Sequence, residues 1–158
     1  MKPTVSKYYN LFIEGKGFLG KVEDFKEPNI KTMKAESALG YKIDIGVPEP
    51  LEAEATISSI NDVIYTAMQK SDSAKFEIKE IVVEDGKEIT VYHTMLGPFE
   101  FEYDSTKIKE TKKAKIKFYP SQYTKEIDGK EVIFVDVFAP ILRENGKDVL
   151  EETRNKII

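Results

Sequence analysis

The chain contains no cysteine and only one histidine among its 158 residues. The absence of cysteine excludes disulfide bonds, thiolate metal sites and cysteine catalysis, and it suits a reducing compartment. His93 has no second ligand residue at a metal-binding spacing, so we interpret it as a structural histidine within a strand. The sequence therefore predicts neither a metal site nor a cofactor.

Familiar catalytic motifs are also missing. The sequence has no glycine-rich phosphate loop, no nucleophile elbow and no zinc motif. Two carboxylate pairs, Glu52 with Glu54 and Glu100 with Glu102, are the remaining candidates for acid–base chemistry. Each pair lies on the outward face of an alternating strand, which favours a solvated surface. We therefore expect no catalytic residue, and a protein that is not an enzyme.

Neither a large charge excess nor a long apolar run is present. The net charge is −4, which argues against binding nucleic acid through a basic surface. The N-terminal segment lacks the apolar core of a signal peptide, and no stretch approaches a membrane span. With 41% apolar and 33% charged residues, the composition is typical of a globular protein. We expect one cytoplasmic domain over residues 1–158.

What the sequence does contain is strand periodicity. Between residues 113 and 118, apolar side chains alternate with lysines, which predicts a strand with one buried face. Residues 132–138 are apolar at almost every position, as expected for a strand covered on both sides. Between these segments, Asp128-Gly129 is a hairpin turn signal. We expect a long hairpin made of these two strands to anchor the fold.

The remaining patterns predict more strands and two helices. Apolar residues at helical spacing over 60–68 predict an amphipathic helix that ends near Lys70. Near the C-terminus, Val149, Leu150 and Ile157 predict the apolar side of a short helix. Further strands are expected at residues 8–13, 18–25, 51–57, 76–83, 89–95 and 99–103. The fold class is mostly β, an antiparallel barrel or sandwich with one packed amphipathic helix and a short C-terminal helix.

Residues 29–50 are the least regular part of the sequence. Glycines, prolines and charged residues surround a short extended piece at 41–45. Long ordered loops of this kind are uncommon and often carry function. Two interpretations remain open, a loose excursion of the chain or an arm that reaches a neighbouring molecule.

Three segments resemble the major tail tube protein of contractile-tailed bacteriophages and phage-tail-like bacteriocins. The opening YYNLFIEGKGFLGKVEDFKEPNIKTMKAE resembles the start of that family, and LEAEATISSINDVIYTAM resembles its strand-to-helix step. The last third, YTKEIDGKEVIFVDVFAPILRENGKDVLEETRNKI, is the most similar segment. It matches the family's closing pattern at Asn145, Gly146, Asp148, Leu150 and Arg154. Together the segments span nearly the whole chain.

The resemblance implies a structural protein. Subunits of this family join their sheets edge to edge into hexameric rings, which stack into a tube inside a contractile sheath. Implied partners are further copies of the chain, the tail sheath protein, and the baseplate and tail terminator proteins, with no membrane. DNA would pass through the lumen without sticking. The implied location is the virion tail, assembled in the bacterial host cytoplasm, of either a DNA-ejecting phage or a headless bacteriocin.

The resemblance also assigns two sets of residues. The first would form an arm that stacks one ring on the next: Lys31, Lys34, Glu36, Tyr41, Ile43 and Ile45. The second would line the lumen, where a negative wall repels DNA: Glu52, Glu54, Glu100 and Glu102. The lysines at 113, 115 and 117 form a competing row of opposite sign. Both rows also fit solvated faces.

Two alternatives come from other classes of protein. The related type VI secretion tube protein shares this architecture and would carry effectors instead of DNA. A monomeric β-barrel that binds a small apolar ligand would have an interior cavity and would not self-associate.

Overall fold

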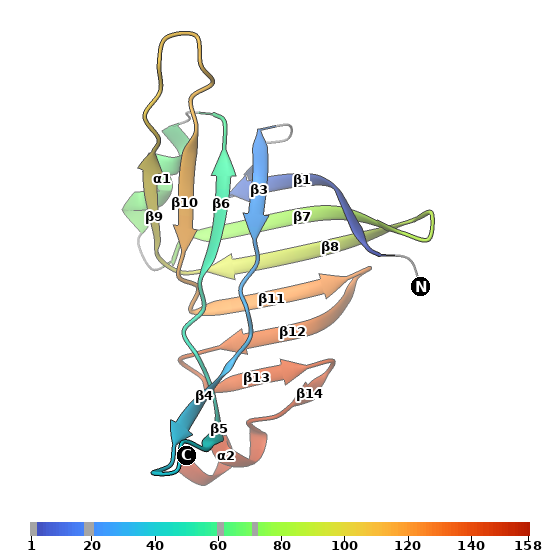
Figure 1. Cartoon of the computed structure of the whole chain (residues 1–158), viewed down its shortest axis with the longest axis vertical. Coiled ribbons are helices and arrows are strands. Elements are labelled where there is room, and N and C mark those ends of the chain that lie inside the picture. The colour runs from blue at the N-terminus through green and yellow to red at the C-terminus, as the bar shows by residue number, and fades with distance from the viewer. Residues whose placement is uncertain (1–2, 18–20, 60–61, 71–72) are drawn as a thin grey trace.

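The computed structural model describes residues 3–17, 21–59, 62–70 and 73–158. Two antiparallel β-sheets pack face to face, with two short helices and one projecting hairpin (Figure 1). The predicted fold class, mostly β with a packed helix and a short C-terminal helix, is confirmed. Among the described helices, none is long and apolar enough to cross a membrane.

The large sheet contains eight strands in the order β14-β13-β12-β11-β8-β7-β1-β2. The tight turn Asp85-Gly86 joins β7 to β8, and both residues have the positive φ that such hairpin turns require. The strands of this sheet are β1 (Val5–Ile13), β2 (Lys16–Gly17), β7 (Lys75–Glu84), β8 (Lys87–Leu96), β11 (Gln122–Ile127), β12 (Lys130–Asp136), β13 (Ile141–Glu144) and β14 (Lys147–Asp148).

The small sheet contains four strands in the order β3-β6-β10-β9, and each neighbouring pair is antiparallel. Its strands cross those of the large sheet steeply (Figure 1). They are β3 (Val22–Lys26), β6 (Ala53–Ile57), β10 (Ala114–Phe118) and β9 (Phe99–Tyr103).

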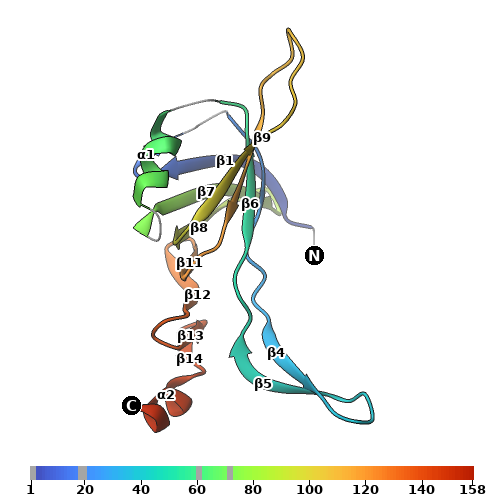
Figure 2. The same cartoon turned by 90° about the vertical axis from the view of Figure 1, so that its left-hand side faces the viewer.

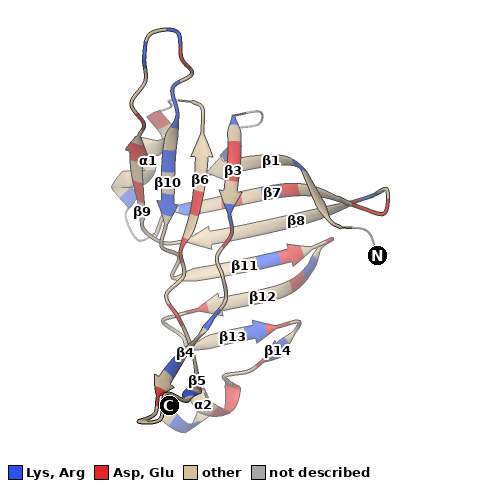
Figure 3. Cartoon of the chain, viewed as in Figure 1, with Lys and Arg blue, Asp and Glu red and all other residues tan. Residues whose placement is uncertain are grey.

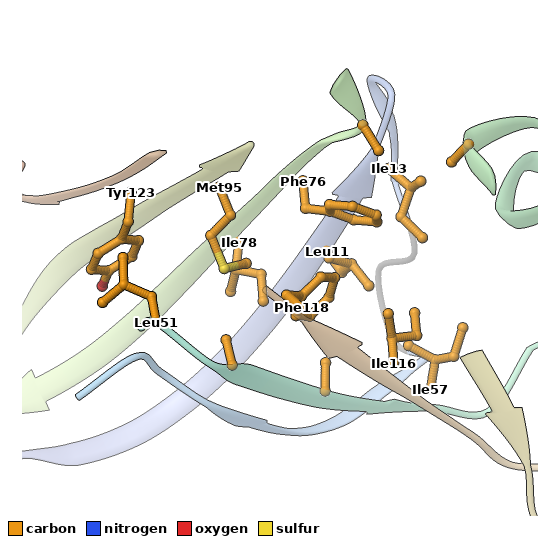
Figure 4. Close-up of a cluster of buried hydrophobic side chains, with 14 of the residues drawn as sticks. Leu11, Ile13, Leu51, Ile57, Phe76, Ile78, Met95, Ile116, Phe118 and Tyr123 are labelled. Carbon is orange, nitrogen blue, oxygen red and sulfur yellow. The ribbon is translucent and has the colours of Figure 1, made fainter. Parts of the chain in front are cut away.

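The core lies between the two sheets, where alternate side chains of each strand meet (Figure 4). Phe76 of the large sheet packs edge-on against Phe99 and Phe118 of the small sheet, with ring centroids 4.9 and 4.6 Å apart. Such aromatic contacts add to the burial of apolar area that stabilises the sandwich. Other fully buried side chains include Leu11, Ile13, Ile57, Ile78, Met95, Ile116 and Tyr123.

The expected hairpin between residues 113–118 and 132–138 is wrong. The Asp128-Gly129 turn joins β11 to β12, whereas β10 pairs with β6 and β9 in the other sheet. The chain passes from one sheet to the other at Pro120, which has no N–H to continue a ladder. Residues 132–138 are also not covered on both sides: β12 ends at Asp136, only Val135 within it is buried, and Phe138 beyond it is 84% exposed.

The two helices agree with prediction in position but only partly in burial. Helix α1 (Asp62–Lys70) ends at the predicted residue and buries Ile64 and Ala67, while Ile60 lies outside the described residues. Helix α2 (Glu151–Ile157) buries none of its own side chains. Leu150, just before α2, is buried, but Val149 and Ile157 are exposed, so the expected apolar side is confirmed for Leu150 alone.

The segment predicted as irregular is a regular hairpin. Strands β4 (Thr32–Glu36) and β5 (Lys42–Pro48) pair with each other in a separate two-stranded sheet. The hairpin projects from the end of the sandwich, away from the large sheet (Figure 2). We call β4, β5 and their turn the arm.

Candidate assembly surfaces

The outward face of the small sheet carries the charged residues that the sequence singled out. In one row across the strands, Glu54 pairs with Lys117, and Lys117 pairs with Glu100. In the next row, Thr56 pairs with Lys115, and Lys115 pairs with Glu102. Figure 3 shows acidic and basic positions next to each other on β6, β10 and β9. We call this the charged face.

The acidic row and the lysine row therefore lie on the same face of the small sheet, and not on two different faces. Directly opposite side chains on antiparallel strands lie close enough to interact. Lys117 has Glu54 on one side and Glu100 on the other, so its charge is locally compensated. The charged face therefore carries positive and negative side chains side by side. This arrangement does not support a purely negative surface.

Glu52 lies next to this face, just before β6. It lines a depression of about 330 Å³ together with Lys26, Glu54, Lys117 and Tyr119. The Tyr119 hydroxyl donates a hydrogen bond to Glu100 over 3.2 Å. The structure thus brings Glu52, Glu54 and Glu100 together on one side of the molecule, along with lysines that were not assigned to the same site.

The edges of the two sheets differ. The large sheet ends in β2 and β14, which contain two residues each. Strand β2 covers only Phe12 and Ile13 of β1, so over residues 5–11 no described strand pairs with the outer side of β1 either. The small sheet ends in β3 and β9, which contain five residues each. In the described part of the chain, no segment pairs with the outer side of either strand. The small sheet therefore presents two full-length open edges.

One face of the arm is apolar and uncovered. Tyr41, Ile43 and Ile45 alternate along the second half of the arm and are 71%, 48% and 53% exposed. Met33 and Val47 add exposed apolar area to the arm. Sequence analysis missed these two residues, although Val47 continues the alternation of β5.

The polar candidates of the arm support its hairpin. Lys34 on β4 forms an ion pair with Asp44 on β5 at 3.0 Å. Hydrogen bonds from Thr32, the Gly46 amide and Lys34 lower the pKa of Asp44 to about 2. Glu36 lies opposite Lys42, and the Lys31 carbonyl accepts a hydrogen bond from the Glu49 amide at the base. The six predicted arm residues thus divide into an apolar face and a polar framework.

An apolar groove lies where the arm meets the sandwich. Its volume is about 480 Å³, and its lining includes Met33, Pro48, Leu51, Val137 and Phe138. Sequence analysis missed this surface because it placed residues 132–138 in a fully covered strand.

His93 and Tyr123 form a polar contact inside the sandwich, and we interpret it as structural. His93 is fully buried, and its Nδ1 lies 2.8 Å from the Tyr123 hydroxyl. Burial lowers the pKa of His93 to about 4, although Glu27, with Oε2 3.7 Å from Nε2, opposes the shift. Within the described ranges, no group of three or more His, Asp or Glu side chains is placed to bind a metal ion.

Comparison with known proteins found similarity to a protein family and to solved structures. A family model described as phage tail tube protein FII matches residues 3–157. The solved structure of Hcp1 from Flavobacterium johnsoniae is similar with a TM-score of 0.51 and 11% sequence identity, over 79% of this chain and 98% of that chain. At this identity the likeness concerns the fold alone. A comparison with curated proteins gave no match.

Proposed function

The chain belongs to the phage tail tube protein FII family, and from this premise we propose that its copies form six-membered rings that stack as the inner tube of a contractile tail. The observation that carries the proposal is the pair of open, full-length edges on the small sheet. An uncovered edge strand is a liability in a monomer because its backbone groups can pair with other chains. In a ring, the next copy covers each edge.

Strand directions support closure of the ring. Each neighbour in the order β3-β6-β10-β9 is antiparallel, so the two edge strands run in opposite directions. Rotation about an axis roughly along these strands brings β9 of one copy beside β3 of the next as an antiparallel pair. The contact is head-to-tail, and repeated rotation closes it into a continuous barrel without edges.

The charged face is then the wall of the lumen. The other face of the small sheet packs on the core and the large sheet, so the large sheet lies outside the barrel. Because each lysine on the wall has carboxylate neighbours, the wall offers no continuous basic track to a phosphate backbone. DNA could pass without sticking. In this proposal Glu52, Glu54, Glu100 and Glu102 line the lumen as predicted, but they share the wall with lysines instead of forming a purely negative lining.

The arm supplies the contact between rings. It extends beyond the sandwich and exposes an apolar face that an adjacent ring would cover (Figure 2). The large sheet would face the sheath, and the two ends of the tube would meet the baseplate and the terminator. In this role the protein is structural and non-catalytic, and it resides in the tail of a particle assembled in the host cytoplasm.

The test is the mass and shape of the purified protein across a concentration series, by light scattering and negative-stain microscopy. We expect rings with a central hole, and rods of stacked rings at higher concentration. An 18.0 kDa monomer at every concentration would contradict the proposal. If that monomer also bound a hydrophobic probe saturably, the ligand-binding barrel would replace the tube as the better account.

A further inference from the structure

We propose that Lys26 of one copy forms ion pairs with an acidic row on β9 of the next copy, and that this contact gives the ring its head-to-tail order. The acidic row consists of Glu100, Glu102 and Asp104, the last of which directly follows β9. The inference rests on the proposed ring and names the side chains that join its subunits. We call this contact the seam.

The first argument is the order of charges across the sheet. Lys26 on β3 lies opposite Glu54, which continues the row through Lys117 to Glu100. The signs alternate from strand to strand, positive at the β3 edge and negative at the β9 edge. When β9 of one copy lies beside β3 of the next, the alternation continues across the seam.

The second argument concerns register. A closed barrel requires its strands to tilt and stagger, so the row of one copy meets the next copy at a displaced residue. Side chains on one face of a strand recur every second residue. On β9 and its extension, three successive positions of that face are acidic, namely Glu100, Glu102 and Asp104. Lys26 therefore meets a carboxylate in any of three registers.

The third argument is that Lys26 is available. It is exposed, and it forms no ion pair with any described residue, unlike Lys34, Lys113 or Lys125. Two strands separate β3 from β9, so the two edges of one sheet lie roughly 14 Å apart at ordinary strand spacing. A direct ion pair between Lys26 and Glu100 consequently needs two copies.

One residue opposes the seam. Asp24 lies two positions before Lys26 and points to the same face, where it pairs with Thr56. In the register that places Lys26 beside Glu100, Asp24 lies beside Glu102. Replacing this carboxylate by a cation, Asp24→Lys, should therefore increase ring yield.

The experiment uses two full-length variants with reversed charges, Lys26→Glu and the double substitution Glu100→Lys/Glu102→Lys. Alone, each variant repeats a like-charge contact at every seam, so ring yield at fixed concentration should fall by about tenfold or more. An equimolar mixture can alternate the two variants around a six-membered ring, and every seam is then matched. We expect the mixture to recover rings that microscopy and light scattering detect.

The matched control is Lys115→Glu, which makes the same charge change on an interior strand of the same face. The cross-strand neighbours of Lys115 belong to its own chain, so Lys115→Glu should form rings alone, and mixing it with the acidic-row variant should not raise ring yield above that of Lys115→Glu by itself. Thermal unfolding of each variant separates loss of assembly from loss of folding. Unchanged ring yield for folded Lys26→Glu, or a mixture without recovery, overturns the seam but leaves the ring. Absence of rings in the unmodified protein removes the proposed function itself.

Discussion

At the scale of single residues, His93 and Gly97 each limit which substitutions the sandwich can accept. His93 places an imidazole between the sheets, stacked beside Tyr123 and edge-on to Phe25 with centroids 5.1 Å apart. Gly97 joins β8 of the large sheet to β9 of the small sheet with φ +153°. At His93, burial disfavours a charged side chain in the core. At Gly97, where the chain passes between the sheets, nearby backbone atoms leave no space for a side chain.

His93 should make folding stability depend on pH. Its pKa is about 4 in the folded chain and about 6.5 when unfolded, because burial disfavours the imidazolium. The unfolded chain therefore binds the proton first, so the stability is present above pH 6.5 and is lost as the pH falls towards 4. We expect His93 to contribute about 2 kcal/mol to the loss of unfolding free energy between pH 7 and 5.

Urea titrations of the unmodified chain and His93→Gln at both pH values measure this contribution. Carboxylates with lowered pKa, such as Glu14 and Glu77, also lose stability in acid, but they are present in both proteins. The difference between the two proteins isolates the histidine. An equal loss in both would show that the imidazole is not the group responsible.

Gly97 should not tolerate a side chain. A Cβ there would lie 2.7 Å from the Tyr119 carbonyl oxygen and 2.9 Å from the Ser121 nitrogen, both backbone atoms. We expect Gly97→Ala to lower the unfolding free energy by about 3 kcal/mol or more. Gly86→Ala is the control, since Gly86 also has positive φ but no atom within 4 Å of such a Cβ, and about 1 kcal/mol is expected. Equal losses would mean that backbone conformation alone, and not the close approach, sets the cost.

At the scale of elements, the arm differs from every other part of the chain. Its strands pair only with each other, and its apolar face has no core beneath it. Hydrogen bonds between its two strands and the Lys34–Asp44 ion pair stabilise the hairpin internally, and its base lies against the sandwich. The exposed side chains of its outer part, Tyr41, Ile43 and Ile45, can therefore be altered with little effect on the core.

Placing charge on the apolar face of the arm should separate ring formation from stacking. We expect Ile43→Asp/Ile45→Asp to form rings but not rods, because both side chains are about half exposed and contribute to no core cluster. Glu36→Gln, on the polar side of the arm, should still form rods. Microscopy of the three proteins at equal concentration makes the comparison. Rods of normal length from the doubly substituted protein would refute a stacking role for this face.

Sequence periodicity predicted elements better than it predicted their partners. Alternation located β6, β9 and β10 with the correct buried faces, because burial of one strand face is a local signal. Strand pairing depends on residues far apart in the sequence. The Asp128-Gly129 turn was therefore predicted correctly, but the strand that enters it is β11 and not the predicted strand at residues 113–118. The arm was predicted as irregular because Gly40, Gly46, Pro48 and the nearby Pro50 favoured a loop, despite the alternation of apolar residues at 41–47.

At the scale of the whole molecule, the two sheets have different structural roles. The large sheet completes the core, whereas the small sheet has two five-residue edge strands without a described partner and an outward charged face. Sequence analysis found the acidic residues of that face but could not place the lysines beside them, since cross-strand register is a property of the folded sheet. Lys26 was missed for the same reason.

The absence of cysteine gives a direct way to locate the charged face in the assembly. Lys117→Cys would place the only thiol of the chain on that face, and Lys87→Cys would place it at the exposed turn between β7 and β8. We expect a bulky maleimide polymer to label both variants as monomers, but only Lys87→Cys after assembly. Equal labelling of the assembled variants would place the charged face outside the tube.

The central claim is that this chain closes its small sheets into one continuous barrel, and electron cryomicroscopy of the assembled protein tests it most directly. We predict a ring of six subunits, about 108 kDa from 18.0 kDa chains, whose inner wall consists of β3, β6, β10 and β9 from every copy. Strand β9 of each copy should lie antiparallel to β3 of the next. A ring whose hole is lined by the large sheet, or a particle in which β3 and β9 remain unpaired, would contradict the account.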